Sequence, residues 1–406
     1  MLATNGPRLW DSLMAMAEIG ATANGGSSRL ALTEADAAGR ALFAQWAEAA
    51  GLAVHHDAVG NQFARRAGAE AVPPVVLGSH LDTQPRGGRF DGVLGVLAAL
   101  EAVRTLNEHD ITTRAPLEIS NWTNEEGARF TPAMLGSSAF TGAMPLAEAL
   151  ARADAEGVTL GDSLATVGAA GDTPLARDFD AFFEIHIEQG PVLEANGVEI
   201  GVVTGGQAIR WLDVRVTGRA GHAGTTPMPA RRDALFAAAE LAQTIERRVA
   251  ETDGLLATVG ECHVEHGSRN TIAADLRFTL DLRHPDDAVV DAAIDDLRAR
   301  FAAVAERRGV DCAVEPHWRS PALPFDETCV GHVREAARAL DCRWQDMISG
   351  AGHDAFHLAR HCPTAMIFIP CAGGLSHHEA ESIEAEHARI GADVLVNAAL
   401  ARAGRA

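Results

Sequence analysis

The sequence predicts an α/β fold in which a mixed-sheet domain is split by an inserted, ferredoxin-like α+β domain. Three observations carry this prediction. Short apolar strands alternate with helical patterns near both ends of the chain, and the order changes to β-α-β-β-α-β in the middle. Clusters of His, Asp and Glu, which form the candidate site, lie on both sides of that middle block. We therefore expect a first segment (1–208), an inserted domain (209–320) and a second segment (321–406) that completes the split domain.

Composition bounds the class of protein. At 406 residues the chain exceeds one ordinary core, and 47% apolar with 22% charged residues is typical of a soluble globular protein. The net charge of −21 argues against a nucleic-acid partner. No apolar run approaches the ~20 residues that span a bilayer, and 1–20 lacks the basic start of a signal peptide. We expect a cytoplasmic protein with no membrane partner, whose six cysteines are reduced packing residues.

The elements of the first segment follow from caps and apolar spacing. A capping box at Thr33–Asp36 predicts a helix over about 34–50. Val75–Leu77 is a short buried strand with His80 just past its end, and a helix is predicted after Asp91, where apolar residues recur at helical spacing.

Two more strands are predicted in this segment. Leu117–Trp122 precedes a turn at Asn124–Gly127, and Phe182–Glu188 alternates, with Phe and Ile on one face and Glu and His on the other. The polar residues therefore fall at strand ends, where open α/β sheets build their sites.

The remaining elements are predicted in the following order. The inserted domain has a strand (Trp211–Val216), a helix (about Ala230–Glu251), two strands (Leu256–Val264 and Ala273–Arg283), a helix (Pro285–Arg308) and a strand (Val310–Val314). After Pro321 come a strand (Thr364–Ile369), a loop with His377 and a closing helix from about Ala385.

Five separated clusters each offer an imidazole or a carboxylate. They are Gly78–Asp82, Asp91–Gly92, Asn124–Gly127, Glu184–Gly190 and Ser376–His377. Nitrogen and oxygen ligands without thiolate suit Zn²⁺, Mn²⁺ or Co²⁺. Because two such ions that share a carboxylate can generate hydroxide at neutral pH, the whole set predicts a two-metal hydrolase.

Taken singly, these residues also have simpler interpretations. His80 alone is usually a hydrogen-bonded structural residue, and Asp91 could be an ordinary helix N-cap. Asp82, two residues after His80, could orient its ring or stabilise its charge, so we count Asp82 among the catalytic residues. The adjacent carboxylates at 125–126 repel each other unless a cation or a proton separates them. Of the two histidines at 377–378, only one can point at a given ion.

The chain resembles the M20-type metallohydrolases, and among them the hydantoinase/carbamoylase amidases: N-carbamoyl-L-amino-acid hydrolases, β-ureidopropionases and allantoate amidohydrolases. The resemblance runs nearly end to end. It rests on GSHLDTQPRGGRFDG (78–92), NEEGARF (124–130), EIHIEQGPVLE (184–194), GHAGTTPM (221–228), DLRH (281–284), GAGHDA (350–355) and GLSHHEAE (374–381).

This resemblance implies two divalent metal ions per subunit, Zn²⁺ or Mn²⁺/Co²⁺. His80, Asp91 and His186 would hold one ion, and Asp91, Glu126 and His377 the other, so that Asp91 bridges them. The histidine at 186 favours the amidase branch, because related peptidases commonly place a carboxylate there.

The resemblance also implies the residues that act on the substrate. They are Glu125 as general base and acid, His222 as the group that polarises the carbonyl or stabilises the oxyanion, and Gln189, His222, Asn270 and Arg283 as substrate contacts. From the sequence alone, Arg283 is more simply a surface residue paired with Asp281 or Asp286.

The activity that the resemblance implies is metal-assisted hydrolysis of the carbamoyl C–N bond of N-carbamoyl-L-amino acids. The substrate would be an N-carbamoyl or ureido carboxylate, and the inserted domain would form a homodimer in which His222 and Asn270 reach the neighbouring active site. An allantoate amidohydrolase shares this chemistry and is the main alternative. An M20 peptidase and a non-catalytic metal-dependent binding protein are the others.

Overall fold

The computed structural model describes residues 1–406. The chain divides into two compact units, one formed by Met1–Gly205 with Pro324–Ala406 and the other by Gly206–Leu323. None of its helices combines the length and the apolar character that crossing a bilayer demands. Each unit is described by itself below.

The first unit is built on one mixed sheet of nine strands, in the order β1-β2-β4-β3-β5-β14-β6-β12 with β13 beside β6. The strands are β1 (Ala53–His56), β2 (Gln62–Arg66), β3 (Val75–His80), β4 (Leu117–Trp122), β5 (Ala181–Ile187), β6 (Ile200–Gly206), β12 (Leu323–Pro324), β13 (Trp344–Ser349) and β14 (Thr364–Ile369). The central strands β4, β3, β5 and β14 are parallel, while β2 and β6 join them antiparallel. The predicted mixed-sheet α/β fold is therefore confirmed.

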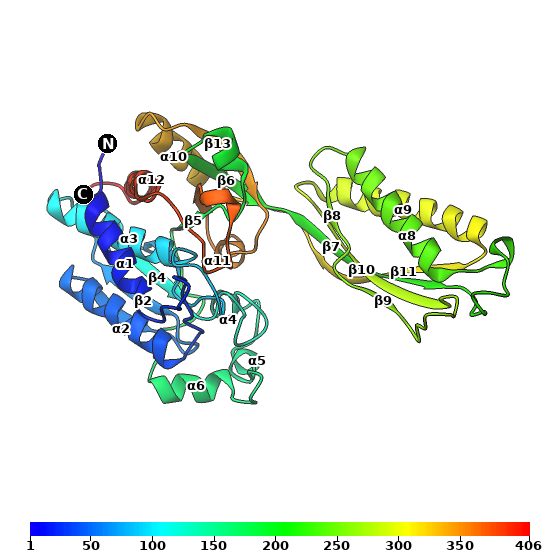
Figure 1. Cartoon of the computed structure of the whole chain (residues 1–406). Coiled ribbons are helices and arrows are strands. Elements are labelled where there is room, and N and C mark those ends of the chain that lie inside the picture. The colour runs from blue at the N-terminus through cyan, green and yellow to red at the C-terminus, as the bar shows by residue number, and fades with distance from the viewer. The chain divides into compact units, whose positions relative to one another are not determined.

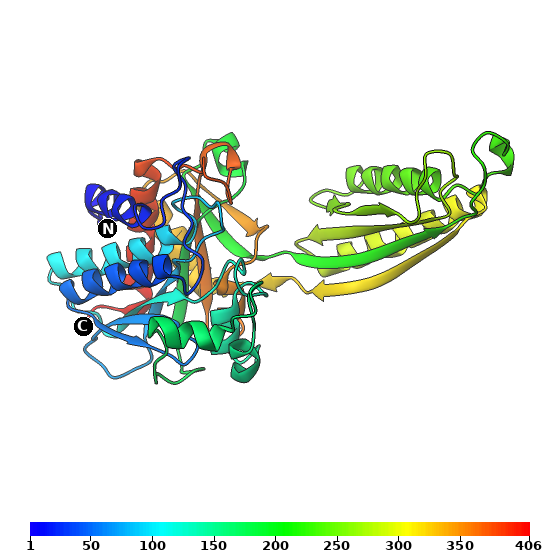
Figure 2. The same ribbon diagram turned by 60° about the horizontal axis from the view of Figure 1, so that its bottom comes forward.

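Helices cover both faces of this sheet (Figure 1, Figure 2). They are α1 (Gly6–Ala17), α2 (Glu34–Ala49), α3 (Val93–Glu108), α4 (Leu135–Phe140), α5 (Leu146–Leu150), α6 (Leu160–Val167), α7 (Val192–Asn196), α10 (Glu327–Ala339), α11 (Asp354–Leu358) and α12 (Ala385–Ala403). Gly391 of α12 lies against Ile185 of β5, whereas the Ala355 N–H of α11 donates to Glu184, 3.1 Å away. Since consecutive strand residues point to opposite faces, α12 and α11 lie on opposite sides of β5.

Several predicted elements occur within a residue or two of their predicted bounds. β4 and β14 have the predicted limits, and α2 begins after Thr33, whose side chain accepts a hydrogen bond from the Asp36 N–H. β3 is longer than predicted because its pairing with β4 continues to His80 and Trp122. His80 is therefore the last residue of a buried strand rather than part of a loop.

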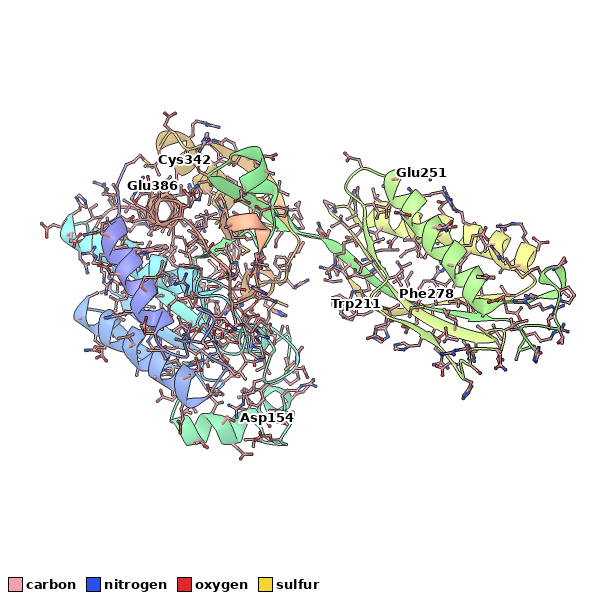
Figure 3. All side chains as sticks on the ribbon, in the orientation of Figure 1. Asp154, Trp211, Glu251, Phe278, Cys342 and Glu386 are labelled. Atoms are coloured by element: carbon pink, nitrogen blue, oxygen red, sulfur yellow. The ribbon has the colours of Figure 1, made fainter.

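The second unit is an antiparallel sheet with two helices on one face. Its elements are β7 (Ala208–Thr217), a 3-10 turn (Met228–Ala230), α8 (Ala234–Ala250), β8 (Leu256–Thr258), β9 (Cys262–Val264), β10 (Asp275–His284), α9 (Asp287–Arg308) and β11 (Asp311–Ser320). The strand order is β11-β7-β10-β8, with β9 also on β10. Phe278 of β10 belongs to the core between sheet and helices (Figure 3). This is the predicted ferredoxin-like arrangement.

Two details of this unit differ from the prediction. The single strand predicted over 256–264 is interrupted: Thr258 pairs with Asp281 and Cys262 with Phe278, so four steps of this strand face three of β10. The helix predicted from about Ala230 begins at Ala234, where the Asp233 side chain accepts hydrogen bonds from the first free N–H groups of α8.

Candidate metal centre

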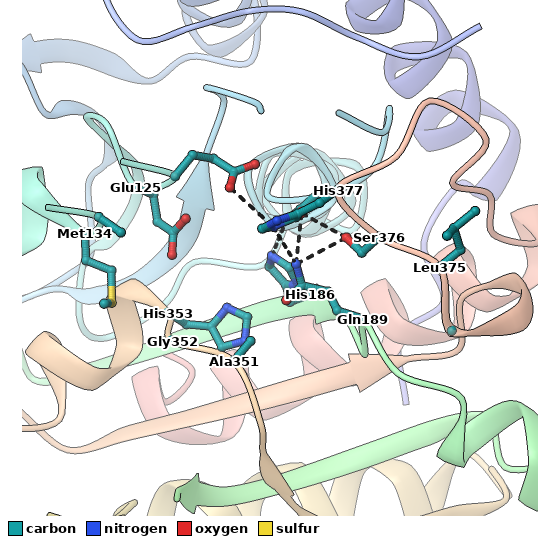
Figure 4. Close-up of a pocket in the computed structure, with 14 residues that line it drawn as sticks. Glu125, Met134, His186, Gln189, Ala351, Gly352, His353, Leu375, Ser376 and His377 are labelled. Atoms are coloured by element: carbon teal, nitrogen blue, oxygen red, sulfur yellow. Dashed lines mark hydrogen bonds and ion pairs between the residues drawn. The ribbon is translucent and has the colours of Figure 1, made fainter. Parts of the chain in front are cut away.

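The predicted ligands of the first unit converge at the carboxyl ends of its parallel strands. β3 ends in His80, β5 carries His186, β4 leads into the loop of Glu125, and β14 leads into the loop of His377. A cavity of about 550 Å³ opens at this edge of the sheet (Figure 4). Residues nearly 300 positions apart are thus brought to one place by the strand order.

Asp91 lies at the middle of this cluster and turns one oxygen to each side. Its Oδ1 lies 2.8 Å from His186 Nε2 and 3.7 Å from His80 Nε2. Its Oδ2 lies 3.4 Å from His377 Nε2, which is also 3.4 Å from Glu126 Oε2. The donor atoms therefore form two groups that could each hold an ion, with Asp91 common to both.

The two buried imidazoles are oriented by backbone carbonyls. Nδ1 of His80 lies 2.9 Å from the Asp82 carbonyl, and Nδ1 of His186 lies 2.8 Å from that of Ile187. A carbonyl can only accept, so each Nδ1 carries a proton, and in its neutral form each ring turns an unprotonated Nε2 to the cluster. Nε2 of His80 is buried without a hydrogen-bond partner, which fits a position that binds a cation.

The Asp82 carboxylate holds the glutamate loop rather than the His80 ring. It accepts hydrogen bonds from the N–H groups of Glu125 and Glu126, at 3.2 and 3.3 Å, whereas it is 3.9 Å from His80 Nδ1. Asn124 takes the left-handed conformation that turns the chain here, with φ of 56°. Asp82 thereby fixes where both glutamate side chains begin.

Glu126 is held from a second direction by Gln84. The Gln84 N–H donates to one carboxylate oxygen at 3.1 Å, and its side-chain amide donates to the other at 2.7 Å. Glu125 has no such clamp, and its Oε2 lies 3.4 Å from His80 Nε2. One carboxylate of the pair is therefore fixed, while its neighbour borders the cavity.

The buried carboxylates lack compensating positive charge. Burial, and then the charges of Asp354 and Glu126, raise the pKa of Glu125 well above its usual range. Burial raises the pKa of Asp82 to about 7. A pair of divalent cations would reverse this balance and keep the carboxylates ionised. The electrostatics of the cluster thus fit the metal site that its donor atoms indicate.

Asp91 is the exception among these carboxylates. Burial opposes its ionisation, but the imidazoles of His186, His80 and His377 hold its pKa below the usual range. Conversely, burial would lower the pKa of His186, yet Asp91 raises that pKa to about 9. The bridging position is therefore the one carboxylate that stays charged even without an ion.

The alternative interpretations can now be compared with the geometry. Asp91 makes no side-chain cap, because the N-cap of α3 is Gly92 and has no side-chain hydrogen bond. His377 reaches the cluster, while the neighbouring His378 is exposed and accepts the Ala380 N–H through Nδ1.

The predicted substrate residues are found in three places. Gln189 lies in the metal cluster, where its amide donates to Asp91 Oδ2 at 2.9 Å. His222 and Asn270 lie side by side on two loops of the second unit, joined by an Ala223 N–H to Asn270 carbonyl bond of 2.9 Å. Arg283 lies on β10 and forms an ion pair of 2.7 Å with Asp281.

Four residues of the centre were not assigned a role from the sequence. The Ser376 hydroxyl lies 3.1 Å from Asp91 Oδ2 and 2.9 Å from Glu381 Oε2, and Glu381 accepts the Asp91 N–H, so this pair supports Asp91. His353 is buried against the His186 ring, with centroids 4.5 Å apart. Glu184, also buried, accepts from Ser79 at 2.6 Å. The only available signal was their place in the quoted motifs, since none differs from an ordinary core or loop residue.

Comparisons with known proteins agree with this geometry. The family model described as "Peptidase family M20/M25/M40" matches residues 76–401. An N-carbamoyl-L-amino-acid amidohydrolase from Rhizobium meliloti is 47% identical, over 98% of this chain and 96% of its own length. A crystal structure of a hydantoinase/carbamoylase family amidase from Burkholderia ambifaria is 60% identical and superposes with a TM-score of 0.97, covering 100% of this chain and 99% of that one. A ureidoglycolate hydrolase from Arabidopsis thaliana is 36% identical over 91% of this chain and 80% of its own length.

Proposed function

We infer that this chain, which belongs to peptidase family M20/M25/M40 and within it to the hydantoinase/carbamoylase amidases, hydrolyses the carbamoyl C–N bond of N-carbamoyl-L-amino acids. The products would be the L-amino acid, ammonia and CO₂. One observation carries the proposal: Asp91 presents one oxygen to each of two groups of metal-binding atoms, beside the Glu125 carboxylate, which belongs to neither group.

Relatives of known name favour a carbamoyl substrate over other ureides. The N-carbamoyl-L-amino-acid amidohydrolases share 47% and 39% identity with the chain, and the ureidoglycolate hydrolase of Arabidopsis shares 36%. An allantoate or ureidoglycolate substrate is the alternative. It would be cleaved by the same chemistry, so the distinction lies in which substrate the enzyme turns over.

We propose that two divalent ions, Zn²⁺ or Mn²⁺/Co²⁺, are held by His80, Asp91 and His186 and by Asp91, Glu126 and His377. Imidazole nitrogen and carboxylate oxygen are suitable ligands for these ions. When bound, such ions lower the pKa of water and polarise a carbonyl.

The protein residues would then carry out the proton transfers. Glu125 takes a proton from the attacking water at a carboxylate oxygen, and water oxygen adds to the carbamoyl carbon. His222 donates a hydrogen bond to the oxyanion that develops. Glu125 then delivers its proton to the nitrogen of the leaving amino acid as the C–N bond breaks, and the carbamate released decays to ammonia and CO₂.

Recognition of the substrate would rest on its carboxylate. We propose that Arg283 binds it through two parallel N–H···O bonds, with Gln189 contacting the substrate within the metal cluster. In the structure Arg283 forms an ion pair of 2.7 Å with Asp281. The substrate carboxylate would therefore have to displace the Asp281 carboxylate from Arg283.

The separation of these residues supports the proposed homodimer. His222 and Asn270 lie near the Asp275 end of β10, whereas Arg283 lies at its other end. Eight residues of strand at ~3.3 Å each separate Asp275 from Arg283 by about 26 Å. A small substrate cannot contact both ends at once, so we propose that His222 and Asn270 serve the active site of a second copy in a cytoplasmic homodimer.

Replacing Glu125 by Gln tests the proposal. The amide keeps the size of the side chain but cannot accept the proton, so turnover should fall by about a hundredfold to ten-thousandfold while metal content is unchanged. Ammonia release from N-carbamoyl-L-amino acids, allantoate and ureidoglycolate measures both activity and substrate choice. If Glu125→Gln keeps activity within tenfold of the parent, Glu125 is not the base. If the parent releases ammonia faster from allantoate than from N-carbamoyl-L-amino acids, allantoate is the substrate instead.

A further inference from the structure

The loop that carries His222 is held in place by the end of the second unit's sheet. Residues 221–226 run exposed between β7 and the 3-10 turn before α8. On one side, the Ala223 N–H donates to the Asn270 carbonyl and the Ile272 N–H donates to the Gly221 carbonyl, both at 2.9 Å. One edge of the loop is thus fastened to the loop that carries Asn270.

A backbone hydrogen bond fixes the tautomer of the His222 ring. The Gly224 N–H donates to His222 Nδ1 at 3.1 Å. Nδ1 must therefore be the unprotonated nitrogen, and the neutral ring carries its proton on Nε2. The ring presents to its surroundings the hydrogen-bond donor that a developing oxyanion requires.

Arg231 holds the other side of the same loop. Its Nε donates to the Thr226 carbonyl at 3.1 Å, and its terminal nitrogen donates to the Ala223 carbonyl at 2.7 Å. The two carbonyls bracket Gly224, the residue whose N–H fixes the ring. A guanidinium can span them because its donors form a rigid planar fork, which the single ammonium of Lys cannot reproduce.

The backbone of Arg231 is itself anchored to rigid elements. Its N–H donates to the Met228 carbonyl at 3.2 Å. The next residues connect to the sheet, where the Arg219 N–H donates to the Arg232 carbonyl and the Ala234 N–H to that of Ala273. Arg231 therefore connects the exposed loop to the start of α8 and to the sheet end.

We propose that Arg231 is a positioning residue for His222: it holds the Ala223–Thr226 turn so that Gly224 keeps the His222 ring in its Nε2-protonated form. This inference rests on the proposed role of His222 in catalysis. The Arg231 side chain donates to backbone carbonyls on both sides of Gly224, so in this proposal its contribution to turnover passes through His222.

A double-mutant cycle separates this role from a merely structural one. Arg231→Met should lower kcat by about tenfold in the parent enzyme, because a misplaced group near the reaction loses much of its effect. In the His222→Ala background the same change should alter kcat by less than about twofold, since a residue acting only through His222 has nothing left to position. Both are measured on the full-length, metal-loaded enzyme with an N-carbamoyl-L-amino acid.

The adjacent Arg232 supplies the matched control. It is exposed and its side chain makes no hydrogen bond or ion pair, so Arg232→Met should leave kcat unchanged. Arg231→Lys should recover only part of the loss. Nitrogen NMR of labelled histidine in the metal-loaded protein reports the tautomer directly, and Arg231→Met should convert the single Nε2–H form of His222 into a mixture.

The outcomes separate the two proposals. If His222→Ala lowers kcat but the loss from Arg231→Met is undiminished in that background, Arg231 acts on the fold and the positioning role is overturned, while the function stands. If His222→Ala leaves kcat intact, the catalytic role of His222 fails and the role of Arg231 with it. An unchanged His222 tautomer in a folded Arg231→Met protein also overturns the positioning role.

Discussion

The two units of the protein place an imidazole in opposite ways. In the first unit, His80 and His186 are each 1% exposed, and strand backbone determines where both rings lie. In the second unit, His222 is exposed on a loop, where its ring accepts one hydrogen bond, from the Gly224 N–H. The Arg231 side chain holds the Ala223 and Thr226 carbonyls of the same loop. The first arrangement is as rigid as the sheet, while the second depends on individual side chains.

This difference matches the chemistry proposed for each site. Ions are bound tightly only if several ligands are already in position, which a buried sheet edge provides. A group that meets the substrate of a second copy must instead be accessible, and an exposed loop provides that at the expense of rigidity. The predictions that follow test whether the two units differ in this way.

The largest effect is expected from Asp91, which both groups of ligands share. Asp91→Ala should remove both ions and lower turnover by about a thousandfold or more, because no other carboxylate faces both groups. Elemental analysis and ammonia release measure the two losses. Asp11→Ala, at an exposed position of α1, is the control and should change neither. Full retention of both ions would contradict the shared position.

The second effect contrasts two left-handed glycines, one in each unit. Gly92 has φ of 67°, and a methyl group there would lie 2.3 Å from the His80 ring. Gly254 has φ of 72°, but its methyl group would lie 3.4 Å from the nearest atom, on His284. Gly254→Ala should therefore cost only the conformational strain, about 1–2 kcal/mol, whereas Gly92→Ala should also displace His80 and reduce metal content. Denaturant unfolding measures the loss of stability, and elemental analysis measures the metal content. Equal effects of the two substitutions would show that the His80 ring can move aside without loss of metal.

The sequence could predict those helices and strands in which the pattern of apolar and polar residues matches their burial in the structure. β4 and β14 are fully buried strands whose predicted limits agree with the structure, and α2 followed from its cap. The metal cluster could be predicted because its residues are chemically distinct and follow strands. Family resemblance supplied the pairing of ligands with ions, which no spacing in a single sequence contains.

Other features leave no trace in such patterns. The interruption between β8 and β9 is a one-residue shift in register against β10, which the residues of 256–264 alone do not show. Asp82 was expected to orient His80, yet that role falls to its carbonyl while its carboxylate holds the glutamate loop. Arg231 binds backbone carbonyls, which every residue possesses, so its partners cannot be read from residue types.

A smaller effect is expected from Arg283, which we propose binds the substrate carboxylate. Arg283→Ala should raise KM by about a hundredfold with less change in kcat, because two charge-assisted hydrogen bonds are worth about 3 kcal/mol. Arg277, exposed on the same strand, is the matched control, and Arg277→Ala should leave KM unchanged. Asp281→Asn should lower KM if the Arg283–Asp281 pair competes with substrate. An unchanged KM in Arg283→Ala would place the carboxylate elsewhere.

The smallest effect concerns acid stability in the first unit. Burial, and then the charge of Arg360, lower the pKa of His357 to about 4 from an ordinary value of 6.5. Between these two values the unfolded chain binds a proton that the folded protein does not, so stability falls as the pH decreases through this window, by about 1 kcal/mol per pH unit. His357→Gln should remove that part of the slope. Urea unfolding of chelated protein at pH 6 and pH 5 measures it, with His109→Gln, exposed after α3, as the control. If His357→Gln unfolds with the slope of the parent, protonation of this half-buried imidazole does not cause the loss of stability.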